Sequence, residues 1–282
     1  NKSKLSAKGF LVLVEDKDAV LPDGTVVENG MEFRNHFHLN PIAVGDFFVP
    51  CGGRPAAVPL DSVRTFLYSD EEGRSLRFKY VVEGANLFFT QEARLVMEKA
   101  GVVVFKDASA NKGGVTSSSL EVMAALALND EEFAANMAVL DLKAIPDFYS
   151  TYVAEVQKRV EHNATLEFEC LWREHERTGR PRCELTDQLS TKITRLSADI
   201  EESDTLWANA ALRNRVLRDA VPVTLTEKLG FDVVMERLPE NYKRALFGSQ
   251  LASKFIYENG IETPEFAFYE YVDSLLRTDA AM

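Results

Sequence analysis

The sequence has few cysteines and no long apolar run. Its three cysteines are scattered and odd in number, at Cys51, Cys170 and Cys183. This usage indicates free thiols in a reducing compartment rather than a disulfide framework. We therefore expect a cytoplasmic protein, with mitochondria as the alternative. Because no stretch is long and apolar enough to span a bilayer, we expect no membrane association.

Positive charge is also scarce. Thirty-two Lys and Arg residues stand against 44 Asp and Glu residues, a formal net charge of −12. Nucleic acids and anionic membranes select basic surfaces, so neither is expected as a partner. A small anionic ligand remains compatible with this charge, because a few local donors outweigh the global field.

A glycine fingerprint of the form G-x-G-x-x-G is missing. A complete dinucleotide-binding domain carries it after the first strand, with an acidic residue about twenty positions later. The parallel sheet described next is therefore either a different fold or the second half of a dinucleotide domain.

Short apolar runs alternate with turn residues up to about Leu128. A helix at 90–101, capped by Thr90 and ended by Gly101, lies between two strands. This βαβ unit predicts parallel strands with a right-handed crossover. The remaining expectations are a turn or hairpin at 21–33 and strands at 10–16, 45–50, 77–86 and 102–107.

From Asn129 onward the sequence is almost entirely helical in pattern. One apolar stripe at steps of three and four is formed by Leu185, Leu189, Ile193, Leu196 and Ile200. The predicted fold is α/β: the second half of a Rossmann-like parallel sheet domain at 1–128, then a mostly α-helical C-terminal region at 129–282.

Three glycine-containing segments follow the predicted parallel strands, at 49–55, 83–90 and 106–114. Ligands of open parallel sheets collect at the carboxyl ends of the strands. Asn86 and Asn111 offer amide donors and acceptors that match a carboxamide such as nicotinamide. The helix that follows Gly114 offers its N-terminus, and the hydroxyls at 116–119, to a carboxylate or phosphate.

Each of these features also has a purely structural interpretation. Asn and Gly are common turn residues, and Ser or Thr at a helix start is commonly a cap. Lys112 could act as an amine nucleophile, but nothing nearby suggests desolvation, so a solvent-facing or carboxylate-paired lysine is favoured. His36 and His38 would share a strand face, yet no Cys or acidic cluster completes a metal site, and no metal is expected.

The motifs taken together resemble a known family. "EGAN" at 83–86 and "KDASANKGGVTSSSLEV" at 106–122 resemble the signature of glutamate dehydrogenases. "VPCGGRP" at 49–55, "QLSTKITRL" at 188–196 and "FIYENGIE" at 255–262 are similar to the large, NAD-specific, fungal-type branch. The resemblance covers essentially the whole chain.

The resemblance implies a set of residue roles. Asn86 and Asn111 would contact the nicotinamide carboxamide and its ribose, and the backbone of Pro50, Cys51 and Gly52 would pass beside NAD. Val115 would pack on the aliphatic part of L-glutamate, and Ser118 would hydrogen-bond its side-chain carboxylate. The reaction implied is hydride transfer from the α-carbon of glutamate to NAD, then hydrolysis to 2-oxoglutarate and ammonia.

The departures from the family pattern imply a segment rather than a whole enzyme. The catalytic Lys and Asp of the family belong to an upstream substrate domain, which nothing here matches, so no catalytic residue is assigned. The chain would be the C-terminal segment of a longer enzyme, inactive alone, in a homo-oligomer of four or six subunits. Many smaller members have Ala where this chain has Lys112, and the sequence assigns that lysine no role.

Two alternatives stay open at this point. One is another amino-acid dehydrogenase of the same superfamily, acting on leucine or phenylalanine. Ser118 argues against this alternative, because an apolar substrate side chain would leave its hydroxyl without a partner. The other is a helical oligomerisation module whose loops are structural.

Overall fold

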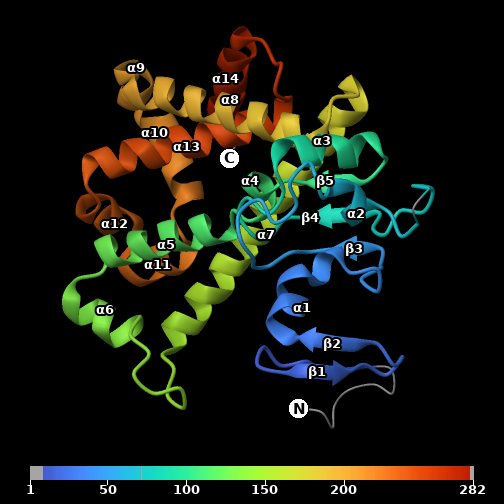
Figure 1. The fold of residues 1–282 in the computed structure, drawn as a ribbon. Coiled ribbons are helices and arrows are strands. Elements are labelled where there is room, and N and C mark those ends of the chain that lie inside the picture. The colour runs from blue at the N-terminus through green and yellow to red at the C-terminus, as the bar shows by residue number, and fades with distance from the viewer. Residues whose placement is uncertain (1–8, 71, 280–282) are drawn as a thin grey trace. The chain divides into compact units, whose positions relative to one another are not determined.

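The chain forms two compact units, Asn1–Phe105 and Lys106–Met282, within which a computed structural model describes residues 9–70 and 72–279. Figure 1 labels the strands and helices of both units. The division falls at 105/106, whereas the sequence pattern placed a boundary at 128/129. The difference arises because α5 (Gly113–Ala127) buries its apolar face in the core of the helical unit.

The first unit begins with an antiparallel hairpin, as the turn residues predicted. Strands β1 (Lys17–Val20) and β2 (Val26–Asn29) pair with Ala19 opposite Val27. Helix α1 (Gly30–His36) follows directly, and the Asn29 side chain accepts hydrogen bonds from the amides of Met31 and Glu32 at 2.9 and 3.1 Å. A short 3₁₀ turn, η2 (Phe37–Leu39), continues it.

The strand expected at 10–16 does not form. Leu13 and Asp16 close a local turn instead, in which the Leu13 amide donates to the Asp16 carboxylate at 2.7 Å and the Asp16 amide to the Leu13 carbonyl at 3.1 Å. Strand β1 starts one residue later, at Lys17. The Asp side chain offers the backbone a local partner, and this outcompetes the β propensity of the neighbouring apolar residues.

A three-stranded parallel sheet forms the centre of the first unit. Its order is β3 (Phe47–Phe48), β4 (Tyr80–Val82) and β5 (Val103–Phe105). Helix α3 (Gln91–Lys99) connects β4 to β5, so the predicted βαβ unit is confirmed. The predicted cap is confirmed as well, since the Thr90 hydroxyl accepts from the Ala93 amide at 3.3 Å.

Aromatic rings fill the core beside this sheet. Val81 and Val104, at the middle of their strands, have no exposed surface. Helix α2 (Val63–Leu67) contributes Phe66 to a cluster of edge-to-face, tilted and stacked rings. The other members of this cluster are Phe48, Phe78, Phe88 and Phe89.

In the second unit, residues 106–279 are described, and their regular elements are all helices. Its elements are α4 (Asp107–Ala110), α5, α6 (Asp130–Asn136), α7 (Asp147–Thr178), α8 (Arg182–Glu202), α9 (Asp204–Ala208), α10 (Ala210–Ala220), α11 (Val223–Leu229), α12 (Phe231–Arg237), α13 (Glu240–Asn259) and α14 (Glu265–Asp279).

Two packed groups hold these helices together. The apolar face of α5 packs with α7, α11 and α12 around Met123, Tyr152 and Leu225. Helices α8 and α13 pack along each other (Figure 1). The apolar stripe predicted on α8 supplies this contact, with Leu185, Leu189 and Ile200 at most 2% exposed. No helix in residues 9–70 and 72–279 is both long and apolar enough to cross a membrane.

Candidate functional site

Two loops of the first unit leave the same edge of the parallel sheet and touch through their backbones. The carbonyl of Pro50, after β3, accepts the amide of Ala85, after β4, at 2.6 Å. A Cβ added at Gly84 would lie 3.0 Å from the Pro50 oxygen and 3.3 Å from the Cys51 sulfur. A methyl group at this position would be tightly packed, so glycine suits the close approach of the two loops.

Further backbone hydrogen bonds join these two loops. The amides of Ala56 and Val58 donate to the carbonyls of Leu87 and Phe88 at 2.7 and 3.1 Å. Leu87 adopts a left-handed conformation with φ of 55° and exposes 56% of its surface. The loops thus form one braced surface.

The sequence-predicted cofactor residues of the first unit lie on these braced loops. Cys51, Gly52 and Asn86 are exposed there, while Pro50 is buried. Around Gly52, no atom lies within 4 Å of an added Cβ. The loops therefore present backbone and one amide side chain to a ligand, with open space above Gly52.

A buried ion pair fixes the start of the second loop, and the sequence interpretation missed it. The Glu83 carboxylate accepts from Arg94 Nε at 2.7 Å and from its second terminal nitrogen at 2.8 Å. The Glu83 amide also donates to the carbonyl of Phe105, at 3.0 Å. The only sequence signal was an arginine on the apolar face of α3, between Ala93 and Met97.

In the second unit, the segment after β5 is tied to α8. Lys106 pairs with Asp187 at 2.6 and 2.8 Å, and the Ser109 hydroxyl donates to that of Thr186 at 3.1 Å. Asn111 ends α4, and its amide donates to the Asp107 carbonyl at 3.0 Å. The predicted nicotinamide-binding asparagine therefore lies at the end of a short helix that Lys106 and Ser109 anchor to α8.

Lys112 is paired with a carboxylate, which is one of the two environments that the sequence favoured. Its Nζ lies 2.7 and 2.6 Å from the two oxygens of Glu167 on α7. The Tyr257 hydroxyl, on α13, donates to the same carboxylate at 2.7 Å. Glu167 is only 3% exposed. Burial and the adjacent Glu167 charge raise the pKa of Tyr257, so this hydroxyl stays protonated.

Val115 and Ser118 share one face of α5. They are three positions apart, close to one helical turn, and both are exposed, Val115 by 72%. The helix is held by Tyr152, whose hydroxyl donates to the Leu120 carbonyl at 2.5 Å, and by Tyr242, whose hydroxyl donates to the Ser119 carbonyl at 3.2 Å. An apolar group and a hydroxyl are thus presented side by side on an anchored helix.

His36 and His38, which were expected to share a strand face, do not lie on a strand. His36 ends α1 and His38 lies in η2, because the Asn29 cap starts a helix where a strand was expected. His38 Nε2 lies 3.2 Å from the Ala57 carbonyl, and burial lowers its pKa. Within 9–70 and 72–279, no group of three His, Cys, Asp or Glu side chains could hold a metal.

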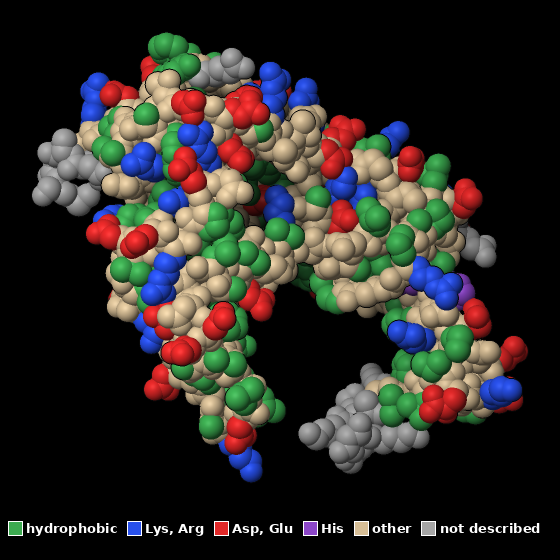
Figure 2. All heavy atoms as spheres, turned by 90° about the vertical axis from the view of Figure 1, so that its left-hand side faces the viewer, with side chains coloured by type: hydrophobic (Ala, Val, Ile, Leu, Met, Phe, Trp, Pro, Cys, Tyr) green, Lys and Arg blue, Asp and Glu red, His purple; other side chains and the backbone are tan. Residues whose placement is uncertain are grey.

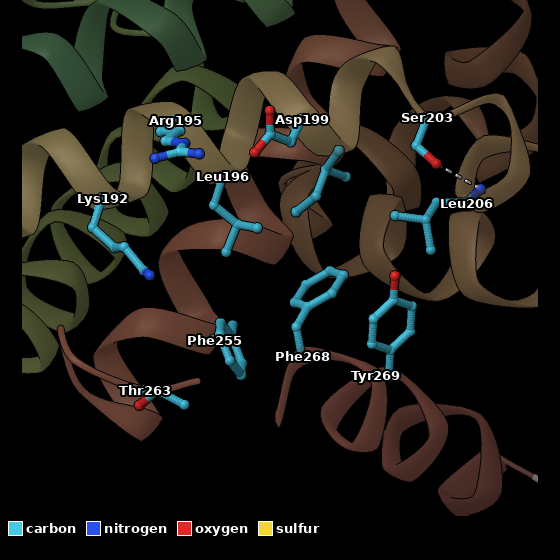
Figure 3. Close-up of a pocket in the computed structure, with 11 residues that line it drawn as sticks. Lys192, Arg195, Leu196, Asp199, Ser203, Leu206, Phe255, Thr263, Phe268 and Tyr269 are labelled. Atoms are coloured by element: carbon cyan, nitrogen blue, oxygen red, sulfur yellow. Dashed lines mark hydrogen bonds between the residues drawn. The ribbon is translucent and has the colours of Figure 1, made fainter. Parts of the chain in front are cut away.

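A cavity of about 430 Å³ lies within the helical unit, between α8, α9, α13 and α14. Figure 3 shows Lys192 and Leu196 pointing from α8 toward Phe255 and Phe268. None of the predicted site residues lines it. The rim carries charges of both signs, Lys192, Arg195 and Asp199, and so does not select one class of ligand.

Comparison with known proteins identifies the family. Residues 15–179 match the sequence model of the Glutamate/Leucine/Phenylalanine/Valine dehydrogenase family, a span that includes all three strand-end segments. The chain belongs to this family. The resemblance drawn from "EGAN" and "KDASANKGGVTSSSLEV" is thereby confirmed, as is an α/β fold with a parallel sheet.

Curated dehydrogenases of this kind match the chain almost from end to end. Glutamate dehydrogenase 2 of Dictyostelium discoideum is 54% identical over 275 residues, which is 98% of this chain and 26% of the relative. The NAD-specific glutamate dehydrogenases of Neurospora crassa and Saccharomyces cerevisiae are 50% and 44% identical, over 96% and 98% of this chain. The chain spans about a quarter of the length of these relatives. No solved structure matches it significantly.

Proposed function

We propose that this chain is part of an NAD-dependent glutamate dehydrogenase, which deaminates L-glutamate oxidatively to 2-oxoglutarate and ammonia. Family membership and the relatives named NAD-specific glutamate dehydrogenase support this activity. The observation that carries the proposal is the braced pair of loops around Gly84, which displays Cys51, Gly52 and Asn86 at the carboxyl edge of a parallel sheet.

The residues on these loops suit the nicotinamide end of NAD. Open space above Gly52 and the close Gly84–Pro50 contact leave backbone accessible to a flat, extended ligand. In this proposal the backbone of Pro50, Cys51 and Gly52 passes beside the cofactor, and Asn86 and Asn111 hydrogen-bond the carboxamide and ribose. NAD, when bound, accepts the hydride that leaves the α-carbon of glutamate.

The exposed face of α5 suits the substrate side chain. Val115 packs on the methylene groups of glutamate, and the Ser118 hydroxyl donates to its side-chain carboxylate. The chain positions substrate and cofactor, whereas proton transfer falls to a Lys and an Asp of an upstream segment. We further propose that the complete protein is a cytoplasmic or mitochondrial homo-oligomer of four or six subunits.

Substitutions in the full-length protein test this assignment. Ser118→Ala should raise KM for glutamate about tenfold or more, because the carboxylate loses a buried donor in the complex. Asn86→Ala and Asn111→Ala should raise KM for NAD. The matched control is Ser119→Ala, an exposed serine one position along the same helix. Unchanged kinetics in all three site variants would contradict the assignment.

Substrate preference distinguishes a glutamate dehydrogenase from a dehydrogenase of apolar amino acids. The family description also covers leucine, phenylalanine and valine. These apolar substrates would leave the Ser118 hydroxyl without a partner, so glutamate should exceed leucine in kcat/KM by a wide margin.

A role in assembly has one specific observation in its favour. Leu140 and Leu142, between α6 and α7, expose 94% and 85% of their surface. Figure 2 shows one face of the molecule with acidic, basic and apolar side chains interspersed. If trimming the helical tail changes the oligomer while Asn111→Ala and Ser118→Ala are silent, the assembly role replaces the enzymatic one.

A further inference from the structure

Lys112 links the two parts of the candidate site in the second unit. It lies between Asn111, which ends α4, and Gly113, which begins α5. The lysine backbone is helical, and its carbonyl accepts the Thr116 amide at 3.0 Å. Any movement of this residue therefore moves both Asn111 and the first turn of α5.

The Lys112 side chain is held by a carboxylate that has little access to water. The Glu167 side chain is 4% exposed, against 40% for that of Lys112. A buried carboxylate must be compensated by donors, and here the compensation comes from Lys112 and from the Tyr257 hydroxyl. Charge-assisted bonds of this length restrict the lysine to one position.

The backbone next to Lys112 is held against the same helix. A Cβ added at Gly113 would lie 3.2 Å from Cγ1 of Val160 on α7. Val160 and Glu167 are seven residues apart, which is about two turns, so they share one face of α7. This face therefore fixes the start of α5 at two points.

We propose that Lys112 is a positioning residue, which acts through Glu167 and Tyr257 to hold Asn111 and the Val115–Ser118 face in their binding geometry. This inference rests on the proposed function. This role is one of positioning rather than of bond making or proton transfer, since both hydrogen bonds of Nζ go to Glu167. Tyr257 extends the same support to α13, so the C-terminal helices contribute to the site without touching a ligand.

Steady-state kinetics of the full-length protein test this role. Lys112→Met and Glu167→Gln should each raise KM for NAD or glutamate roughly tenfold to a hundredfold, the usual effect of a small misplacement. Both break the same link, so the double variant should be little worse than either single one. Lys112→Arg keeps the charge and should restore most of the binding, and Tyr257→Phe should give a smaller rise in KM.

A matched control separates positioning from general stability. Lys254→Met removes the pair that Lys254 on α13 makes with Asp219 at 2.7 Å. It should leave both KM values unchanged, whatever its effect on Tm. If Lys112→Met, Glu167→Gln and Tyr257→Phe lower Tm but leave both KM values at the wild-type level, the link is only structural and the inference is overturned.

The same measurements distinguish a failure of this inference from a failure of the proposed function. If Asn111→Ala and Ser118→Ala raise KM while the Lys112, Glu167 and Tyr257 variants do not, only the positioning role falls. If the Asn111 and Ser118 variants are silent too, the site assignment fails and the positioning role falls with it.

Discussion

The Glu83 carboxylate and the Arg94 guanidinium form two hydrogen bonds, at 2.7 and 2.8 Å, while their side chains are 0% and 3% exposed. This fork-to-fork pair joins the end of β4 to α3. It supports the start of the loop that carries Asn86. Arginine suits this place because its planar donors match a carboxylate and its charge persists when buried.

Breaking one half of this pair should be costly. Arg94→Met removes both guanidinium hydrogen bonds from the buried Glu83 carboxylate, and we expect a loss of about 3–5 kcal/mol in the free energy of unfolding. Replacing both residues with leucine should cost less than the single change. Urea denaturation of the full-length protein measures this. The control is Arg74→Ala, since Arg74 and its partner Glu72 are 75% and 67% exposed and their loss should be silent.

Adding one methyl group at Gly84 should disturb the braced loops. In Gly84→Ala the new Cβ meets the Pro50 carbonyl at 3.0 Å, and one loop must shift. We expect a loss of about 1–3 kcal/mol in the free energy of unfolding and a higher KM for NAD. Gly52→Ala, two residues after Pro50, places its Cβ in open space and should not destabilise the fold. Equal stability of the two variants would contradict the contact.

The three free thiols should differ in reactivity. Cys51 is exposed, whereas Cys170 and Cys183 are buried. Burial raises the pKa of Cys170 to about 11, so about one molecule in a thousand carries its thiolate at pH 8. Iodoacetamide labelling followed by mass spectrometry should modify Cys51 first and the other two only after unfolding. Bound NAD should slow the labelling of Cys51, and rapid labelling of Cys170 in the folded protein would contradict its burial.

Acid should remove a stabilising contact at the start of α11. Burial raises the pKa of Glu155, but hydrogen bonds from the Thr224 amide and hydroxyl, the Val223 amide and Arg159 lower it more, to below the ordinary 4.5. A lowered folded-state pKa gives stability that is present above the unfolded pKa and lost as pH falls through the folded value.

Glu155→Gln tests this pH dependence. At pH 7 it should reduce the free energy of unfolding by about 2 kcal/mol. The difference in the free energy of unfolding between the variant and the wild type should shrink as the pH falls below about 4.5. There the Glu155 carboxylate takes up a proton, first in the unfolded state and then, at lower pH, in the folded state. A gap that stays constant down to pH 3 would show that the carboxylate charge contributes nothing.

Several elements could be predicted because their signals are local. Thr90 and Gly101 delimit α3 by capping chemistry, and the stripe through Leu185 and Leu189 on α8 follows from helical periodicity. The strand expected at 10–16 failed for an equally local reason, because the short turn closed by the Asp16 side chain forms there instead.

The contacts that hold the site could not be predicted from such local signals. Glu167 lies 55 positions from Lys112 and Tyr257 lies 90 from Glu167, and no spacing rule connects residues on different helices. The sequence predicted that Lys112 would meet either solvent or a carboxylate, but not which carboxylate. It also placed the residues up to Leu128 with the sheet domain, whereas α5 packs with the helical unit.

The βαβ unit around α3, the cap and end of that helix and the family itself were determined by the sequence alone, since each depends on neighbours along the chain or on a contiguous motif. Tertiary structure alone decided which charges are buried together and which face of α5 stays exposed. Those outcomes depend on how distant helices pack, because desolvation and hydrogen-bond geometry act through space rather than along the chain.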